Sequence, residues 1–171
     1  RVNRTAKTGL AFDVARKLAE RTKELGWHVQ FLLDVEDHPD LDAMLGSFAT
    51  EVVIDHMGRT DARAGTGTPG FQSLVKLVGD GGCWVKLSGA HRLSNNAPDY
   101  PEAKPFHEAL VRANPERLVW GSDWPHPSAT NGKPDDSLLF DLLATWAPDE
   151  TVRNRILVQN PETLYGFDKS V

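Results

Sequence analysis

Short apolar runs alternate with longer amphipathic stretches along the whole chain. The apolar runs predict strands that begin near Val2, His28, Val52, Trp84 and Leu118. The stretches between them repeat apolar side chains at helical spacing, and they predict helices over 10–25, 39–48, 68–78 and 100–113. Two more helices are expected at 136–146 and 150–159, and a last short helical turn at Asn160.

Strands and helices that alternate in this way form a parallel sheet through right-handed crossovers. Strand starts recur about every 30 residues, which is close to one unit of a (β/α)8 barrel. The fold class is therefore α/β. We expect residues 1–171 to form a single domain, the C-terminal five βα units of a (β/α)8 TIM barrel. A smaller open α/β sheet is the alternative. A half barrel would expose sheet edges, which favours a longer native chain.

Composition narrows the choice of partners and compartment. The chain has 171 residues, of which 40% are hydrophobic and 25% charged, and its net charge is -5. This charge argues against a nucleic-acid or membrane-surface partner, because phosphates attract clustered Lys and Arg. We see no membrane span and no signal peptide, and we expect a cytoplasmic protein. The single cysteine, Cys83, excludes an internal disulfide, and we expect it to pack in the core.

Polar side chains follow three of the predicted strands. The segments are DHMGR at 55–59, SGAHR at 88–92 and SDWPHP at 122–127. The carboxyl ends of parallel strands meet at one rim, where ligands bind. We therefore expect these groups to form one site, with Arg1 joining it from the first strand. Loops 60–70 and 128–135 follow strand ends and are expected to border it.

Asp123 is the main catalytic candidate, because a carboxylate beside a bound substrate can take a proton from water. His56 can polarise a carbonyl, bind a metal or shuttle a proton. Arg59 and Arg92 can each grip a substrate carboxylate with two hydrogen bonds. The structural alternatives are a loop or helix-cap role for Asp123, a core role for His56, and surface salt bridges for the arginines.

The remaining histidines divide by position. His126 is balanced between a site residue and a loop-packing residue, and His91 is interpreted as a loop residue. His38 and His107 are expected on solvated surface. Asp55 should point away from its neighbour His56, because adjacent strand residues face opposite sides.

Several kinds of nucleophile are excluded. The sequence has no glycine-rich phosphate loop and no Gly-x-Ser-x-Gly elbow. Cys83 lies at a strand start, far from the expected rim. Activated water is the nucleophile that remains.

Three motifs together resemble the amidohydrolase superfamily, and within it the 2-pyrone-4,6-dicarboxylate lactonase-like hydrolases. They are VIDHMGR at 53–59, LVWGSDWPHP at 118–127 and NPETLYGF at 160–167. The resemblance implies a distorted (β/α)8 barrel that opens a lactone ring without a cofactor. It also implies that Asp123 activates water, that His56 acts at the carbonyl, and that arginines hold the carboxylates of a small-molecule substrate. These arginines are Arg1, Arg59 and Arg92.

Two positions depart from the pattern that the resemblance suggests. Lys7 stands where an arginine is expected, and Leu32 where a tyrosine is expected. A first-strand His-x-His pair does not occur in this chain. One alternative is therefore a zinc-dependent amidohydrolase or decarboxylase, in which zinc or another divalent metal binds His56 and Asp123. The other is a non-catalytic α/β fragment or binding module.

Overall fold

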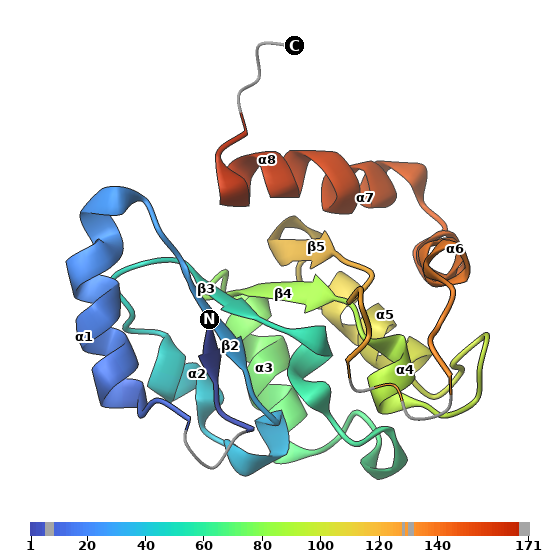
Figure 1. The fold of residues 1–171 in the computed structure, drawn as a ribbon, viewed down its shortest axis with the longest axis horizontal. Helices are drawn as coiled ribbons and strands as arrows, with labels where there is room; N and C mark the ends of the chain where they lie inside the picture. Colours follow the sequence, from blue (N-terminus) through green and yellow to red (C-terminus); the bar gives the residue numbers. More distant parts are fainter. Residues whose placement is uncertain (6–8, 128, 130–131, 168–171) are drawn as a thin grey trace.

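The computed structural model describes residues 1–5, 9–127, 129 and 132–167. Lys7 lies outside these described residues. Five strands form one parallel sheet in the order in which they occur in the chain (Figure 1). They are β1 (Val2–Asn3), β2 (Val29–Leu32), β3 (Val52–Ile54), β4 (Trp84–Leu87) and β5 (Leu118–Trp120). The prediction of five consecutive βα units of a (β/α)8 barrel is confirmed.

Helices follow the strands as the hydrophobic pattern predicted, although several of them are shorter. They are α1 (Phe12–Thr22), α2 (Leu41–Leu45), α3 (Pro69–Gly79), α4 (Ala90–Leu93), α5 (Lys104–Ala113), α6 (Asp136–Trp146), α7 (Glu150–Asn154) and α8 (Asn160–Tyr165). The predicted helix 39–48 shrinks to α2, and the predicted helix 100–113 begins only at Lys104. The short α4, on the expected loop at His91, was not predicted.

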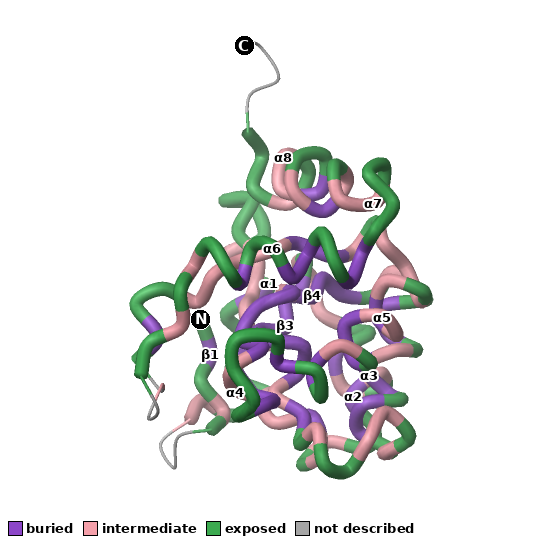
Figure 2. Tube along the Cα trace, turned by 90° about the vertical axis from the view of Figure 1, so that its right-hand side faces the viewer, coloured by how far each residue is buried: buried purple, intermediate pink, exposed green. Residues whose placement is uncertain are grey.

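The two faces of the sheet have different partners. Phe31, Ile54, Val85 and Leu118 belong to a large core shared with the helices. On the other face Val53, Trp84 and Val119 form a small cluster, against which Leu164 of α8 packs. Burying an aliphatic or aromatic side chain of this size stabilises by about 1.5–3 kcal/mol. Figure 2 shows β3 and β4 as buried tubes, whereas the outward turns of α6 are exposed.

The C-terminal helices anchor the last strand. The last helical turn expected at Asn160 continues the preceding helix, because a π-helical turn at Arg155–Gln159 joins α7 to α8. In Figure 1 α7 and α8 run above β5. The buried Asn160 amide donates to the carbonyl oxygens of Leu118 (2.6 Å) and Pro115 (2.8 Å). The NPETLYGF motif thus fixes the start of the strand that leads to Asp123.

His107 was expected on solvated surface, but it is buried in α5, so this prediction is wrong. Its ring packs edge-on against Trp146, with centroids 5.4 Å apart. Neither ring nitrogen has a hydrogen-bond partner among the described residues. Burial lowers the pKa of His107 to about 4, because the charged imidazolium loses its hydration. His38 is half-buried, with its ring edge-on to Phe12.

The buried His107 makes the protein less stable in mild acid. Its folded pKa is below the unfolded value of 6.5, so the unfolded chain binds the extra proton and unfolding becomes easier as the pH falls from 6.5 toward 4. In the wild type the free energy of unfolding should fall between about pH 7 and about pH 5. We expect this fall to be about 2 kcal/mol smaller in His107→Leu. Urea unfolding at the two pH values measures this, and an unchanged difference would contradict it.

Candidate active site

A left-handed turn ends β3 and places His56. His56, Met57, Gly58 and Arg59 all have positive φ, at 53°, 52°, 79° and 51°. Side chains other than glycine rarely adopt this conformation, and such strain persists only where the surroundings enforce it. A Cβ atom on Gly58 would lie 2.5 Å from a methyl group of Val35, so close packing enforces the turn here. The turn therefore holds His56 in one fixed direction.

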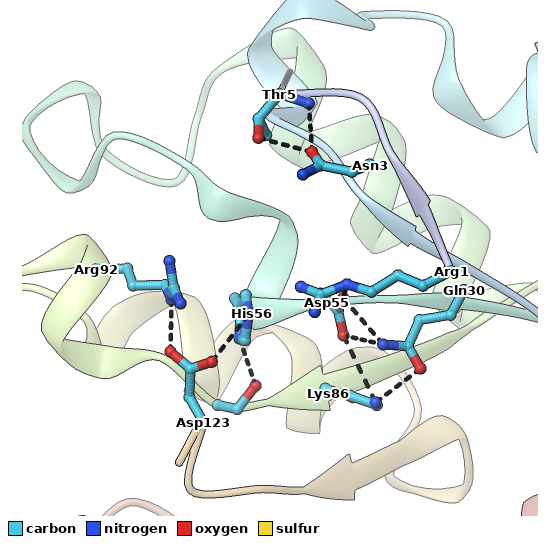
Figure 3. A network of polar contacts seen from close by, with 10 residues as sticks. Arg1, Asn3, Thr5, Gln30, Asp55, His56, Lys86, Arg92 and Asp123 are labelled. Atoms are coloured by element: carbon cyan, nitrogen blue, oxygen red, sulfur yellow. Dashed lines mark hydrogen bonds and ion pairs between the residues drawn. The ribbon is translucent and has the colours of Figure 1, made fainter. Parts of the chain in front are cut away.

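Asp123 is the centre of the polar contacts at the strand ends (Figure 3). Its Oδ2 accepts a hydrogen bond from Arg92 Nε at 2.6 Å and lies 3.3 Å from His91 Nε2. Its Oδ1 lies 3.4 Å from His56 Nε2. The Asp123 side chain is 11% exposed, so water screens these contacts only weakly. Separate strand ends thus converge on one carboxylate, as the sequence predicted.

The surroundings keep Asp123 ionised. Burial alone would raise its pKa, because it strips water from the carboxylate. Hydrogen bonds from His91 and Arg92, and the charges of His56 and Arg92, outweigh burial and hold the pKa of Asp123 well below its ordinary value. Asp123 is therefore a carboxylate at neutral pH, but a weak base while Arg92 is bound to it.

His56 is held between Asp123 and Ser88. Its Nδ1 lies 2.8 Å from Ser88 Oγ, and only 5% of the residue is exposed. Burial lowers the pKa of His56 to about 4, although the charges of Asp123 and Asp55 oppose the shift. The ring is therefore neutral at pH 7. When the Ser88 hydroxyl donates to Nδ1, the ring proton is on Nε2 and faces the Asp123 carboxylate. Ser88 was not singled out from sequence, because a serine at a strand end carries no specific signal.

Gly89 allows α4 to approach His56. Its φ is 71°, and a Cβ atom there would lie 3.0 Å from Arg92 Cδ and 3.1 Å from His56 Nδ1. We expect Gly89→Ala to displace both side chains and to reduce turnover by about 10²-fold, the cost of an ångström-scale misplacement. The control is Gly67→Ala, because a Cβ atom at Gly67 meets nothing within 4 Å. Steady-state rates test this, and equal rates for the two variants would refute it.

A pocket of about 360 Å3 opens beside Asp123. It is lined by Arg1, Asn3, Thr5, Leu32, Arg59, Arg92, Asp123 and Pro127. Arg59 and Arg92 also border a second hollow with residues 60–63. They border a third with Ala129, Gly132 and Pro134. Both predicted loops therefore lie at the site, although residues 128, 130 and 131 are outside the described part of the chain.

The other two arginines, Arg1 and Arg59, each contact a carboxylate through the guanidinium Nε atom. Arg59 Nε donates to Asp34 at 2.6 Å, and Arg1 Nε lies 2.9 Å from Asp55 Oδ2. Asp55 is buried and also accepts from the Gln30 amide at 2.9 Å. Lys86 lies 3.6 Å from Asp55 Oδ1 (Figure 3). Arg1 remains 48% exposed and Arg59 28% exposed, so both can still receive a ligand.

Two histidines occupy unexpected places. His91 is in α4 and contacts Asp123, so its interpretation as a loop residue is wrong. His126 is 3% exposed, and its ring packs edge-to-face against that of His91, with centroids 5.1 Å apart. Neither His126 nor His56 is among the residues that line the 360 Å3 pocket. Its Nε2 lies 2.8 Å from Asp136 Oδ1.

The geometry around His56 bears on the alternative of a bound metal. His56 and Asp123 are close enough to share an ion, with 3.4 Å between Nε2 and Oδ1. Within the described residues, however, the group of three metal-ligand side chains that lie close together is His91, Asp123 and His126, and His56 is not part of it. The residues present therefore offer only two ligands for a zinc ion at His56.

The family model for amidohydrolases matches residues 3–167. A 2-pyrone-4,6-dicarboxylate hydrolase of Comamonas testosteroni is 35% identical over 90% of this chain and 53% of its own length. A 4-sulfomuconolactone hydrolase of Rhizobium radiobacter is 38% identical over 84% of this chain and 49% of its own. The chain thus spans about half the length of the curated relatives that it matches.

A solved structure agrees with these matches. The crystal structure of a candidate 2-pyrone-4,6-dicarboxylic acid hydrolase from Pseudomonas putida superposes with a TM-score of 0.76 and 37% identity, over 90% of this chain and 56% of that one. No helix of the described residues is long and apolar enough to cross a membrane. The motifs, the fold and both kinds of match agree, and the chain belongs to the amidohydrolase family.

Proposed function

We propose that this chain carries the catalytic rim of a hydrolase that opens the lactone ring of a carboxylated substrate by Asp-activated water. One observation carries the proposal: the Asp123 carboxylate and three arginines line the same pocket. A negatively charged substrate held by the arginines places its ring beside a carboxylate that can activate water. The relatives named as hydrolases of 2-pyrone-4,6-dicarboxylate and 4-sulfomuconolactone support an anionic lactone.

The substrate itself frees the base. In the structure Arg92 is bound to Asp123 at 2.6 Å, which makes Asp123 a weak base. A substrate carboxylate in the pocket competes for the same guanidinium, because Arg92 also lines the pocket. When Arg92 turns to that carboxylate, the pKa of Asp123 rises toward that of an ordinary aspartate, and Asp123 becomes a better proton acceptor.

The remaining steps follow from the positions of Asp123 and His56. Asp123 takes one proton from water as the oxygen attacks the lactone carbonyl carbon. The His56 Nε2–H, which faces Asp123, is available to the oxyanion that develops beside it. The bond between the carbonyl carbon and the ring oxygen then breaks, and the ring oxygen takes the proton from Asp123. Water is thereby added across the ester, and Asp123 returns to its ionised form.

A panel of lactones tests this function. The purified protein is given lactones that bear two, one or no carboxylates, and ring opening is followed by proton release and product mass. We expect turnover to increase with the number of carboxylates. Absence of turnover across the panel, in a protein shown to be folded, would contradict the proposal and favour a binding module.

A further inference from the structure

Three side chains that could bind a metal ion lie close together next to the pocket. His91, Asp123 and His126 each offer a ligand atom, and these atoms lie within 4.8 Å of one another. The His91 side chain is 6% exposed and the His126 side chain 2% exposed. Among the described residues, the Nδ1 atoms of His91 and His126 lack a hydrogen-bond partner. Buried nitrogens without partners are costly and call for a ligand.

His126 is oriented as a metal ligand would be. Its Nε2 lies 2.8 Å from Asp136 Oδ1, and this bond leaves Nδ1 unprotonated when Nε2 carries the proton. A carboxylate that holds one nitrogen of a histidine, while the other nitrogen binds a metal, is a recurrent arrangement in metal sites. Asp136 is the first residue of α6, so a regular helix fixes the orientation.

We propose that His91, Asp123 and His126 form a binding site for a divalent transition metal, with zinc as the best fit. Two imidazoles and one carboxylate are a typical zinc ligand set. Ligand atoms about 2.1 Å from a tetrahedral ion lie about 3.4 Å apart. His91 Nε2 and Asp123 Oδ2 already lie 3.3 Å apart. His126 is within 4.8 Å, a gap that a small side-chain shift closes.

Zinc and Arg92 compete for the same oxygen. Arg92 Nε and His91 Nε2 both contact Asp123 Oδ2, so an ion at this oxygen displaces the guanidinium. The zinc site also differs from a site at His56, because His56 contacts the other oxygen, Oδ1. Substitution of Arg92 is therefore expected to strengthen zinc binding, whereas substitution of a ligand weakens it.

Equilibrium dialysis against zinc, with bound metal measured per chain, tests this site. We expect the wild type to bind one zinc ion, and His91→Ala and His126→Ala each to weaken binding at least 10-fold. Asp136→Asn, which removes only the orienting carboxylate, should weaken binding about 10- to 100-fold. Arg92→Met should tighten it. His38→Ala is the control, because His38 lies beside Phe12, away from the cluster.

A second measurement guards against unfolded variants. Zinc should raise the melting temperature of the wild type and leave that of a folded His91→Ala/His126→Ala protein unchanged, because a ligand stabilises only the state that binds it. Equal zinc binding by the wild type and this double variant, weaker binding by Arg92→Met, or loss of binding in His56→Ala alone would each overturn the proposal. None of these measurements uses turnover, so a failure of the proposed lactonase activity would leave their result unaffected.

Discussion

Asp123→Asn is expected to abolish turnover of a carboxylated lactone and to leave substrate binding nearly intact. The amide keeps the shape of the carboxylate but cannot take a proton from water. Loss of a general base typically costs about 10²–10⁴-fold in rate. The fall should appear in kcat, because Arg1, Arg59 and Arg92 still line the pocket that holds the substrate.

Asp80→Asn is the matched control for this experiment. Asp80 is exposed, is paired with Lys76 of α3 and lines none of the hollows around Asp123, so its substitution should leave kcat unchanged. Steady-state kinetics and equilibrium binding of the lactone separate rate from affinity. Activity of Asp123→Asn within tenfold of wild type would exclude Asp123 as the base.

Arg92→Met is the variant with the second largest expected effect, and its effect should depend on the charge of the substrate. For a lactone with two carboxylates, kcat/KM should fall about 10²–10³-fold, because a buried charged hydrogen-bond partner is lost. For an uncharged lactone, kcat/KM should not fall, because the variant also frees Asp123 from the cation that weakens it as a base. Arg112→Met is the control, because its guanidinium is exposed on α5 and lines none of the hollows around Asp123.

The pH dependence of kcat/KM in Arg92→Met is a second, independent test of the role of Arg92. Arg92 lowers the pKa of Asp123, so its removal raises that pKa toward an ordinary carboxyl value of about 4. Turnover needs ionised Asp123, so kcat/KM of the variant should decline at a higher pH than that of the wild type as the solution is acidified. The charge of Arg92 also lowers the pKa of His56, so the loss of Arg92 moves the titration of both groups in the same direction. Superimposable profiles would contradict the assigned role of Arg92.

The sequence was sufficient for the order of strands and helices. Apolar runs separated by amphipathic stretches predicted all five strands, and α6 has the predicted bounds. Three strands end at Ile54, Leu87 and Trp120, because the polar residues that follow leave the sheet and turn toward the site. The π-helical turn before Asn160 could not be predicted, since Asn-Pro commonly marks a helix start.

The sequence predicted which residues gather at the site, but not which of their atoms contact one another. Parallel strands bring their carboxyl ends together, so His56, Arg92 and Asp123 could be placed on one rim from spacing alone. Their side-chain partners depend on local backbone that spacing does not reveal. The left-handed φ values of His56 and Asp123, and the short helix that carries His91, decide which atoms meet. For the same reason the burial of His126 and the contact of Ser88 with His56 emerged only from the structure.

Chelation of the purified protein tests the central claim most directly. Turnover of a dicarboxylated lactone is measured, together with metal content, before and after exhaustive treatment with a chelator and after zinc is restored. The proposed mechanism, in which Asp123 activates water and Arg92 responds to the substrate, predicts full activity in the metal-free protein and lower activity when zinc occupies Asp123. Loss of turnover on chelation, with recovery on addition of zinc, would contradict it.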